Sequence, residues 1–318
     1  MILTITPNAA VDKTYLVHDF RLHCVNRPTR VSTVAGGKGV NVARVFCRLG
    51  GAAAATGFIG GLNGRTIARA LPQDGAEDEF VRVRGESRLC IAIVDSGLGA
   101  QTEVNEPGPE VTRRDLSRLR KRVSQLLKQR RFDFVVMSGR LPPGAPDSTY
   151  AELVHLANQE GARAVLDTSG EALREGIGGR PWMVKPNLAE LEALTGCPQE
   201  DEAAAVEAAK QIHRSGVAVV CHTRGPQGAI LVCDKRAWHA ASPPVRVVSA
   251  VASGDAFVAA FLWAWTQGPE PESFEAALRT AVAAGAANSA VIGAGFIDRA
   301  MIDPLLPYVT LRNLRRSR

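Results

Sequence analysis

The chain has 318 residues, of which 46% are hydrophobic and 22% are charged, and its formal net charge is +6 at pH 7. These values are ordinary for a globular protein, and the length is enough for one large α/β domain or for a core with an insertion. The positive charge is modest, and no nucleic-acid recognition motif accompanies it. A nucleic-acid partner is therefore disfavoured, whereas an anionic small-molecule substrate fits the charge.

The six cysteines form no Cys-x-x-Cys pair, and several lie within apolar runs that are typical of a core. Free thiols of this kind are usual in a reducing compartment. The N-terminus lacks the basic start of a signal peptide, and no apolar run is long enough to span a bilayer. We therefore expect a cytoplasmic protein that does not contact a membrane.

The first third of the chain predicts both a main sheet and a smaller one. Residues 2–6 are apolar and β-branched and end at a Pro-Asn pair, which favours a first core strand. Residues 52–59 are predicted as a strand and residues 64–71 as a helix. Weaker alternation predicts short strands of a small separate sheet, within residues 13–34, 89–94 and 101–104.

From residue 112 onward, strands and helices alternate regularly. Strands are expected at residues 132–137, 162–167, 182–184 and 217–222, and helices from residue 112, at 147–159, around Leu173, and at 188–195 and 202–215. A hairpin at residues 229–233 and 237–241 precedes two further helices, one ending at Trp265 and one over residues 273–290. This alternation predicts a mostly parallel sheet covered by helices on both faces.

Two turns that contain glycine, each followed by an apolar helix, carry most of the chemical information. One is Ala35-Gly36-Gly37-Lys38-Gly39-Val40-Asn41 and the other is Ala252-Ser253-Gly254-Asp255. The first N–H groups of a helix lack partners within it and carry the positive end of its dipole, so such turns favour an anion. Asp255 would lie beside that anion, where phosphoryl transfer needs a proton acceptor. The alternative is that Asp255 is only a first-turn residue favoured by the dipole.

Polar residues collect directly after the predicted strands. They are Asp12, Ser138-Gly139-Arg140, Asp167-Thr168-Ser169-Gly170, Lys185-Pro186-Asn187 with Glu190, and Thr223-Arg224-Gly225. The carboxyl ends of parallel strands lie at one edge of a sheet, where ligands bind. Polar residues are common at strand ends, but their repetition together with two glycine-rich helix starts predicts a site at this edge.

These motifs, in this order, resemble the PfkB branch of the ribokinase-like sugar kinases, most closely its 1-phosphofructokinase/tagatose-6-phosphate kinase group. The resemblance runs from Thr6 to about Gly295 and includes Asn8-Ala9-Ala10-Val11-Asp12, Leu141-Pro142-Pro143-Gly144, Glu171-Ala172-Leu173 and Pro226-Gln227-Gly228-Ala229. It implies a single kinase domain over residues 1–318, with a three-layer α/β/α core and a mostly parallel sheet. It also implies a small β-sheet lid, about residues 10–34 and 86–107, that covers the sugar and supports a homodimer.

The resemblance implies an ATP- and Mg²⁺-dependent kinase that phosphorylates a hydroxyl of a phosphosugar. Asp255 would be the base, and the backbone N–H groups of Ala252, Ser253, Gly254 and Asp255 would hold the transferring phosphoryl group. The implied substrate positions are Asp12, Gly36, Gly37, Lys38, Asn41 and Ser138, with Arg27 and Arg88 of the lid for the existing phosphate. The implied nucleotide positions are Lys185, Asn187, Glu190, Thr223, Gly225, Gly228 and Asn288. Among these, Asn187 and Glu190 would organise Mg²⁺ through water.

Several of these residues have simpler interpretations. Asn187 and Glu190 could only cap the helix that follows them. Arg27 and Arg88 could be surface arginines, Lys38 a solvated helix residue, and Asn288 a plain residue on a helix surface.

Three positions depart from the pattern of the family. Ala252 stands where the family usually has Gly, and a positive φ there would cost about 1 kcal/mol. Arg140 stands in place of a Ser, and Ala9 in place of a Pro. These departures weaken the assignment of the substrate and, to a lesser degree, the prediction of full catalytic activity.

We predict that the substrate is fructose 1-phosphate, phosphorylated at C6 to the 1,6-bisphosphate, because residues 25–27, 102–109 and 167–173 resemble the 1-phosphofructokinase group most. Tagatose 6-phosphate or fructose 6-phosphate is the alternative acceptor. The sequence hardly separates these substrates, because the contacts to the existing phosphate lie in the lid. A catalytically weak sugar-phosphate-binding or regulatory protein on a kinase scaffold is the alternative of another class, motivated by Ala252.

Overall fold

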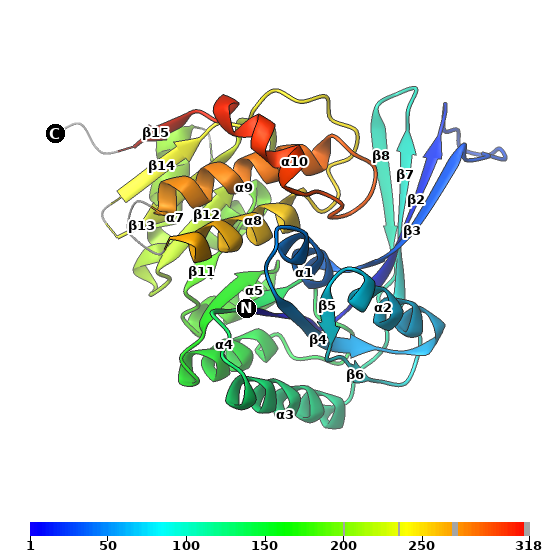
Figure 1. The fold of residues 1–318 in the computed structure, drawn as a ribbon, viewed down its shortest axis with the longest axis horizontal. Helices are drawn as coiled ribbons and strands as arrows, with labels where there is room; N and C mark the ends of the chain where they lie inside the picture. The colour runs from blue at the N-terminus through cyan, green and yellow to red at the C-terminus, as the bar shows by residue number, and fades with distance from the viewer. Residues whose placement is uncertain (200, 235, 269–272, 315–318) are drawn as a thin grey trace.

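The computed structural model describes residues 1–199, 201–234, 236–268 and 273–314. Strands and helices alternate along these residues, and the strands form one large sheet and one small sheet (Figure 1). Within the described ranges, no helix has both the length and the apolar character needed to cross a membrane.

The large sheet is mostly parallel. Its parallel strands are β1 (Ile2–Thr6), β4 (Ala53–Ile59), β9 (Phe134–Ser138), β10 (Arg163–Asp167), β11 (Met183–Val184) and β12 (Val219–Thr223), with the short β5 (Ala76–Asp78) and β6 (Val81–Arg82) beside β4. The antiparallel strands β13 (Ala229–Cys233), β14 (Arg236–Ala240) and β15 (Leu311–Asn313) extend the other edge. The order is β15-β14-β13-β12-β11-β10-β9-β1-β4-β5. The sequence pattern does not predict β5, β6 and β15, because two or three residues carry no periodicity.

Helices cover both faces of this sheet (Figure 1). One layer holds α1 (Lys38–Arg48), α2 (Gly61–Gln73), α8 (Ser253–Gln267) and α9 (Ser273–Ser289), followed by the short α10 (Arg299–Ile302). The other holds α3 (Arg113–Gln129), α4 (Thr149–Gln159), α5 (Glu171–Gly178), α6 (Leu188–Thr195) and α7 (Glu202–Arg214). Each layer packs on its own hydrophobic cluster. Because strand residues alternate between faces, Val136 joins one cluster and Val135 joins the other.

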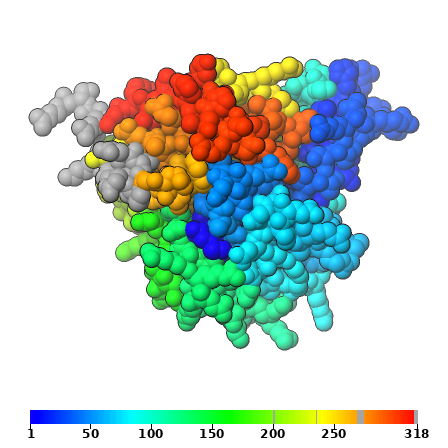
Figure 2. Space-filling view, in the orientation of Figure 1, coloured from blue at the N-terminus to red at the C-terminus, as the bar shows by residue number. Residues whose placement is uncertain are grey.

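The small sheet has the order β3-β2-β7-β8 and consists of β2 (Ala10–Val17), β3 (Arg30–Gly36), β7 (Arg88–Asp95) and β8 (Ala100–Asn105). It projects from one end of the body (Figures 1 and 2). The chain enters β2 shortly after β1 and passes from β3 directly into α1. The base of the small sheet is therefore tied to the carboxyl edge of the parallel strands. The predicted fold class, a three-layer α/β/α core with a mostly parallel sheet and a small separate sheet, is confirmed.

Candidate active site

The carboxyl ends of the parallel strands meet at one edge, as the motifs predict. Ser138 ends β9 and lies directly opposite Asp167, which ends β10. Lys185 follows β11, and Thr223 at the end of β12 forms an isolated bridge with Asn187. Residues far apart in the sequence are thereby placed side by side, because parallel strands all finish on the same side.

Two lysines share one aspartate at the centre of this edge. Lys38 Nζ and Lys185 Nζ lie 3.0 and 3.2 Å from Asp167 Oδ1. Burial raises the pKa of the Asp167 carboxyl, but Lys185 and Lys38 lower it more, so the pKa lies below its usual value. Asp167 therefore stays an anion that holds both ammonium groups in place.

Lys38 remains a cation within reach of a ligand. Burial lowers its pKa, but the carboxylates of Asp167, Asp255 and Glu190 raise it more, so the net pKa is above the ordinary value. Its side chain is 39% exposed, whereas the side chain of Lys185 is 5% exposed. Lys38 is thus the lysine that a dissolved anion can approach.

Asp255 lies in the first turn of α8 and is only 4% exposed. Its Oδ2 accepts a hydrogen bond of 2.8 Å from Asn41 Nδ2 of α1. Burial raises the pKa of Asp255 to about 6, with Lys38 opposing the rise and Asp167 adding to it. Such a carboxylate is ionised at neutral pH, yet it is a stronger base than an exposed aspartate. This is the property required of a residue that accepts a proton from a hydroxyl.

The turn before α8 has an unusual backbone. Ala252 has φ 61° and ψ 8°, in the left-handed region that residues other than glycine rarely adopt. At Gly254 the turn passes close to Lys185, because a Cβ added there would lie 3.3 Å from Lys185 Nζ. The first N–H groups of α8 and the ammonium of Lys185 therefore lie next to each other.

Asn288 of α9 stabilises this turn by a hydrogen bond to its backbone. It is fully buried, and its Nδ2 donates to Val251 O at 2.7 Å while its Oδ1 accepts from Gly295 N at 3.0 Å. The interpretation of Asn288 as an exposed helix residue is wrong, because its position at the end of α9 points it into the turn and not toward solvent. The residue type of an asparagine does not by itself reveal whether the side chain is buried.

The start of α1 brings the backbone close to Asp12. Gly37 caps the helix with φ 95°, a conformation that favours glycine. At Gly36 a Cβ would lie 2.1 Å from Asp12 Oδ2, so the missing side chain is what leaves room for the carboxylate. Burial raises the pKa of Asp12 to about 6, while Arg44, Arg88 and a backbone hydrogen bond from Gly37 lower it.

The two arginines expected in the lid lie in different places. Arg88 begins β7 opposite Ala10, and its Nε donates to Asn8 O at 3.2 Å, near Asp12. Arg27 is exposed in the loop between β2 and β3, at the end of that hairpin farthest from Gly36. The structure brings Arg88 to the other site residues and does not bring Arg27 there.

Among the buried polar atoms without a hydrogen-bond partner in the described residues, two belong to the paired end residues of β9 and β10. They are Ser138 Oγ and Asp167 Oδ2. Buried polar atoms are nearly always paired in folded proteins. These two atoms therefore mark a place where a polar ligand can complete the hydrogen bonding.

A tight turn follows β12. Gly225 and Gly228 have φ of 55° and 86°, and a Cβ on Gly228 would lie 1.9 Å from Ala240 O. Arg224 N donates to Gly228 O at 2.8 Å and closes the turn. Gly228 is thus required by the close approach of Ala240, whereas the positive φ of Gly225 only favours glycine, and the turn lies next to Thr223 at the same sheet edge.

Asn187 and Glu190 form a capping box at the start of α6. Asn187 Oδ1 accepts from Glu190 N, and Glu190 Oε2 accepts from Asn187 N, both at 2.9 Å. Over the described ranges, no group of three or more His, Cys, Asp or Glu could hold a metal. Glu190 nevertheless lies close enough to raise the pKa of Lys38. A single carboxylate of this kind fits an ion held mainly by phosphate and water, as Mg²⁺ commonly is.

Two central residues have no role assigned to them in the sequence prediction, although Asp167 is among the polar residues at the strand ends. Asp167 holds both lysines, and its position at a strand end is the signal that could have identified it. Arg44 of α1 is 1% exposed and donates to Asn41 Oδ1 at 3.0 Å. No sequence pattern marks Arg44, because a charged residue in an amphipathic helix is normally solvated.

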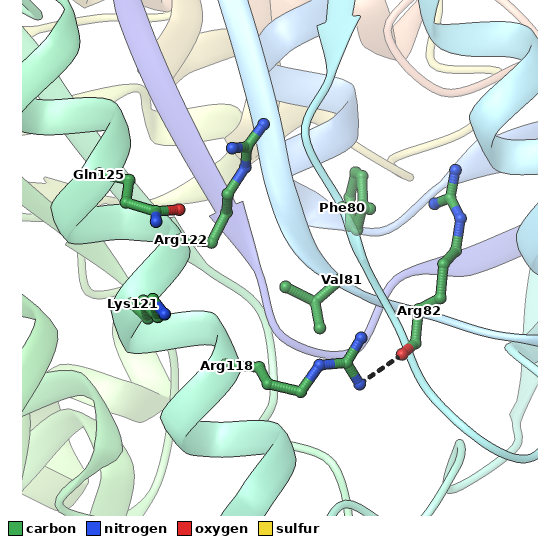
Figure 3. Close-up of a pocket in the computed structure, with 7 residues that line it drawn as sticks. All are labelled: Phe80, Val81, Arg82, Arg118, Lys121, Arg122 and Gln125. Carbon is green, nitrogen blue, oxygen red and sulfur yellow. Dashed lines mark hydrogen bonds between the residues drawn. The ribbon is translucent and has the colours of Figure 1, made fainter.

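A separate hollow lies between α3 and the segment around β6 (Figure 3). It is lined by Phe80, Val81, Arg82, Arg118, Lys121, Arg122 and Gln125. Three of its arginines are already paired with carboxylates, Arg82 with Asp78, Arg118 with Asp115 and Arg122 with Glu79. The positive charge there is largely neutralised, so we assign the anion site to the strand-end edge and not to this hollow.

The comparison with known families agrees with this geometry. The profile of the pfkB family carbohydrate kinases matches residues 5–299. The chain belongs to the pfkB family of carbohydrate kinases. As a member, it is a phosphotransferase that acts on a sugar hydroxyl, and ATP is the co-substrate expected of the family.

Similar proteins cover most of this pfkB kinase. It is 39% identical to a 1-phosphofructokinase of Rhodobacter capsulatus over 84% of both chains. It is 35% identical to a tagatose-6-phosphate kinase of Staphylococcus epidermidis over 81% of this chain and 83% of the relative. A solved phosphofructokinase-2 of Escherichia coli with substrates and products superimposes with a TM-score of 0.89 at 27% identity, covering 97% of this chain and 99% of the other.

Proposed function

We propose that this pfkB kinase transfers the γ-phosphoryl group of ATP to O6 of fructose 1-phosphate and so makes fructose 1,6-bisphosphate. The observation that carries the proposal is the buried Asp255 at the start of α8. Asn41 of α1 holds its carboxylate by a hydrogen bond, and two lysines that share Asp167 lie beside it. The relative with 39% identity, a 1-phosphofructokinase, supports the acceptor. Tagatose 6-phosphate is the second candidate, which the tagatose-6-phosphate kinase at 35% identity favours. Fructose 6-phosphate is the third, because a phosphofructokinase-2 bound to it superimposes with a TM-score of 0.83.

In the reaction, the acceptor oxygen forms a bond to the γ-phosphorus while the bond from that phosphorus to the β-phosphate oxygen breaks. Asp255 takes the proton that the hydroxyl loses, and its raised pKa suits it to this step. The N–H groups of Ala252 to Asp255, the dipole of α8 and the ammonium of Lys185 stabilise the charge on the transferring group. Lys38 adds a second positive charge, beside the same oxygen of Asp167 that Lys185 contacts.

The acceptor is held at the base of the small sheet. Asp12 accepts hydrogen bonds from sugar hydroxyls, and Gly36 and Gly37 let the backbone approach. Asn41 and Ser138 complete the polar lining, since Ser138 Oγ lacks a protein partner in the described structure. Arg88 binds the existing phosphate, and Arg27 joins it only when the loop that carries it moves inward.

The nucleotide lies along the ends of β11 and β12. Lys185 binds its phosphates, and Thr223 with the turn at Gly225 and Gly228 supports the nucleoside. Asn288 contributes by holding the turn at Val251. Mg²⁺ would be held near Asn187 and Glu190 through water, and when bound it neutralises phosphate charge.

The small sheet acts as the lid in this proposal, and it also forms the contact of a homodimer. Asp12 and Arg88 lie on one of its faces. Because strand residues alternate, Tyr15, Val31 and Val104 lie on the opposite face, where Val31 and Val104 are 47% and 56% exposed. An exposed apolar face favours association. The free cysteines support a cytoplasmic location.

Initial rates with fructose 1-phosphate, fructose 6-phosphate and tagatose 6-phosphate, measured as ADP release, test the acceptor. We expect the highest kcat/KM with fructose 1-phosphate. Turnover of unphosphorylated sugars, with none of the three used, would contradict the proposal. Equal inertness of the wild type and of Asp255→Asn, with sugar phosphate still bound, would show a binding protein instead.

The Asp255→Asn variant should lose roughly 10²- to 10⁴-fold in kcat, the usual contribution of a general base. The thermal stability of this variant is the control. The pKa of Asp255 is about 6 in the folded chain and 3.8 for an ordinary aspartate, which stands for the unfolded chain. Stability is therefore lost as the pH rises from 3.8 through 6, and above pH 6 the buried carboxylate carries the full cost. The neutral amide removes this cost, so the variant should be at least as stable as the wild type at pH 8. A lower Tm there would mean that the lost activity reflects unfolding.

A further inference from the structure

We propose that Arg44 is a positioning residue for catalysis, because it fixes the orientation of the Asn41 amide and, through it, the carboxylate of Asp255. The inference rests on the proposed function, in which Asp255 is the base. Arg44 itself does not touch the reacting atoms. It acts from the second turn of α1, behind the site.

Arg44 is held on several sides at once. It is 1% exposed, and its guanidinium donates to Asp74 Oδ2 at 2.7 Å, Ala294 O at 2.9 Å and Ala35 O at 2.5 Å, besides Asn41 Oδ1 at 3.0 Å. The planar, fork-shaped guanidinium can satisfy four acceptors in fixed directions, which the ammonium of a lysine cannot do. The donors of Arg44 are therefore committed, and the side chain has one defined position.

This arrangement determines which end of the Asn41 amide faces Asp255. Asn41 Oδ1 accepts from Arg44, so Asn41 Nδ2 is left to donate to Asp255 Oδ2 at 2.8 Å. A flipped amide would place its oxygen against the carboxylate and its NH₂ group against the guanidinium, and both contacts would be repulsive. Without Arg44, Asn41 loses one of the two contacts that fix the orientation of its amide, and only the Asp255 carboxylate itself still favours the donor.

The other groups around Asp255 do not replace this hydrogen bond. Lys38 of α1 and Lys185 after β11 lower its pKa by their charge, and Asp167 at the end of β10 raises it. Both lysines are bonded to Asp167 and not to Asp255. Among the described residues, Asn41 is the side chain that holds the Asp255 carboxylate by a hydrogen bond, so its orientation determines where the base points.

Arg44 also joins the segments that surround the site. Ala35 lies near the end of β3, at the base of the small sheet, and Asp74 follows α2. Ala294 precedes Gly295, whose N–H donates to Asn288, the support of the turn before α8. Phe296 of the same segment stacks on the guanidinium, with 4.9 Å between the ring centroid and Cζ. Figure 2 shows this late segment, in red and orange, against the blue of α1.

The test is Arg44→Met, which keeps the length and apolar stem of the side chain and removes the donors. We expect kcat to fall roughly tenfold or more because the base is misplaced, with KM for ATP within about twofold of the wild type. The titration of Asp255, followed by NMR of labelled carboxyl carbons, should move to higher pH, because Asn41 no longer stabilises the charged form. NMR is needed because Arg44 also lowers the pKa of Asp12, which the kinetic pH profile would mix with that of Asp255.

Asp74→Asn is the matched control. It removes the ion pair of Arg44 but leaves its hydrogen bond to Asn41, so it should lower the Tm while the Asp255 titration stays unchanged. If Arg44→Met does not fold, Arg44→Lys serves in its place, with the same expected direction of shift. In the background of Asn41→Leu, replacing Arg44 should cause no further shift of Asp255, since both residues act through one amide.

The inference is overturned if Asp255 titrates at the wild-type pH in the folded Arg44 variant, or if the two substitutions shift it additively. Failure of the proposed function looks different. In that case Asp255→Asn would retain turnover, while the dependence of the Asp255 titration on Arg44 could still hold.

Discussion

Ala252 shows how much depends on a single Cβ atom. It occupies the left-handed region with φ 61° immediately before α8, where the pfkB family usually has glycine. The strain of an alanine in this region is about 1 kcal/mol, which is small compared with the stability of a folded domain. The N–H groups of the turn can therefore keep their direction. For this reason the departure at Ala252 is compatible with an active kinase.

We expect Ala252→Gly to raise the free energy of unfolding by up to about 1 kcal/mol, because it removes the strain, and to leave kcat within about twofold. Ala252→Val should do the opposite, since a β-branched residue tolerates positive φ poorly. Its kcat should fall by roughly tenfold or more. Urea unfolding and initial rates measure both effects. A glycine variant with clearly lower kcat would show that alanine is required for the turn.

In the proposed mechanism, three helix starts carry functional groups of the site. The starts of α1, α6 and α8 all lie at the carboxyl edge of the parallel strands, and each is capped differently. Glycine caps α1, a reciprocal Asn187–Glu190 pair caps α6, and strained Ala252 caps α8. Because Asn187 and Glu190 form a capping box, a role in binding Mg²⁺ has to be separated from the role in the helix.

Glu190→Gln makes that separation, because glutamine can still accept the hydrogen bond of the capping box but carries no charge. We expect the Tm to change by less than a few degrees, while the Mg²⁺ concentration for half-maximal rate rises about tenfold. Glu192→Gln, on the same helix, is the control for charge alone. If Glu190→Gln leaves the Mg²⁺ dependence unchanged, Glu190 is only a cap.

At the scale of the whole molecule, the two faces of the small sheet differ in the chemistry of their side chains. One face carries Asp12 and Arg88, and the other exposes apolar side chains, among them Val31 and Val104. A monomer would leave this apolar face in water. In our proposal, this sheet both closes the site and joins two copies of the chain. In the relative from Escherichia coli, phosphofructokinase-2 has an inhibited form that is tetrameric.

Light scattering tests the dimer. The wild type should have twice the mass of one chain, and Val31→Glu combined with Val104→Glu should give a monomer, because burying two charges at an apolar contact is costly. Tyr308→Glu is the control, since Tyr308 is 63% exposed and lies in the short 3-10 helix Asp303–Tyr308, outside the small sheet. A monomeric wild type, or a dimer that survives both substitutions, would exclude this contact.

The sequence by itself determined the fold class and the residue types of the site. Hydrophobic periodicity fixes which strands and helices form, and glycines that precede helices predict backbone that approaches an anion. Asp255 could be proposed from such a helix start and Asp12 from its place after the first strand, whereas the proposed roles of Lys38 and Asn41 come from the resemblance to the family. The short strands β5, β6 and β15 could not, because they are specified by their neighbours and not by their own residues.

The tertiary structure alone decided how these residues act together. Asp167 bonds to Lys38 across 129 positions of the sequence, and Asn41 bonds to Asp255 across 214. No local pattern contains such pairings. Burial decided the remainder, because it raises the pKa of Asp255 and turns Arg44 from a helix charge into a buried donor. The turn at Ser253-Gly254-Asp255 could be read from the sequence, but the hydrogen bonds that hold its aspartate could be found only in the folded chain.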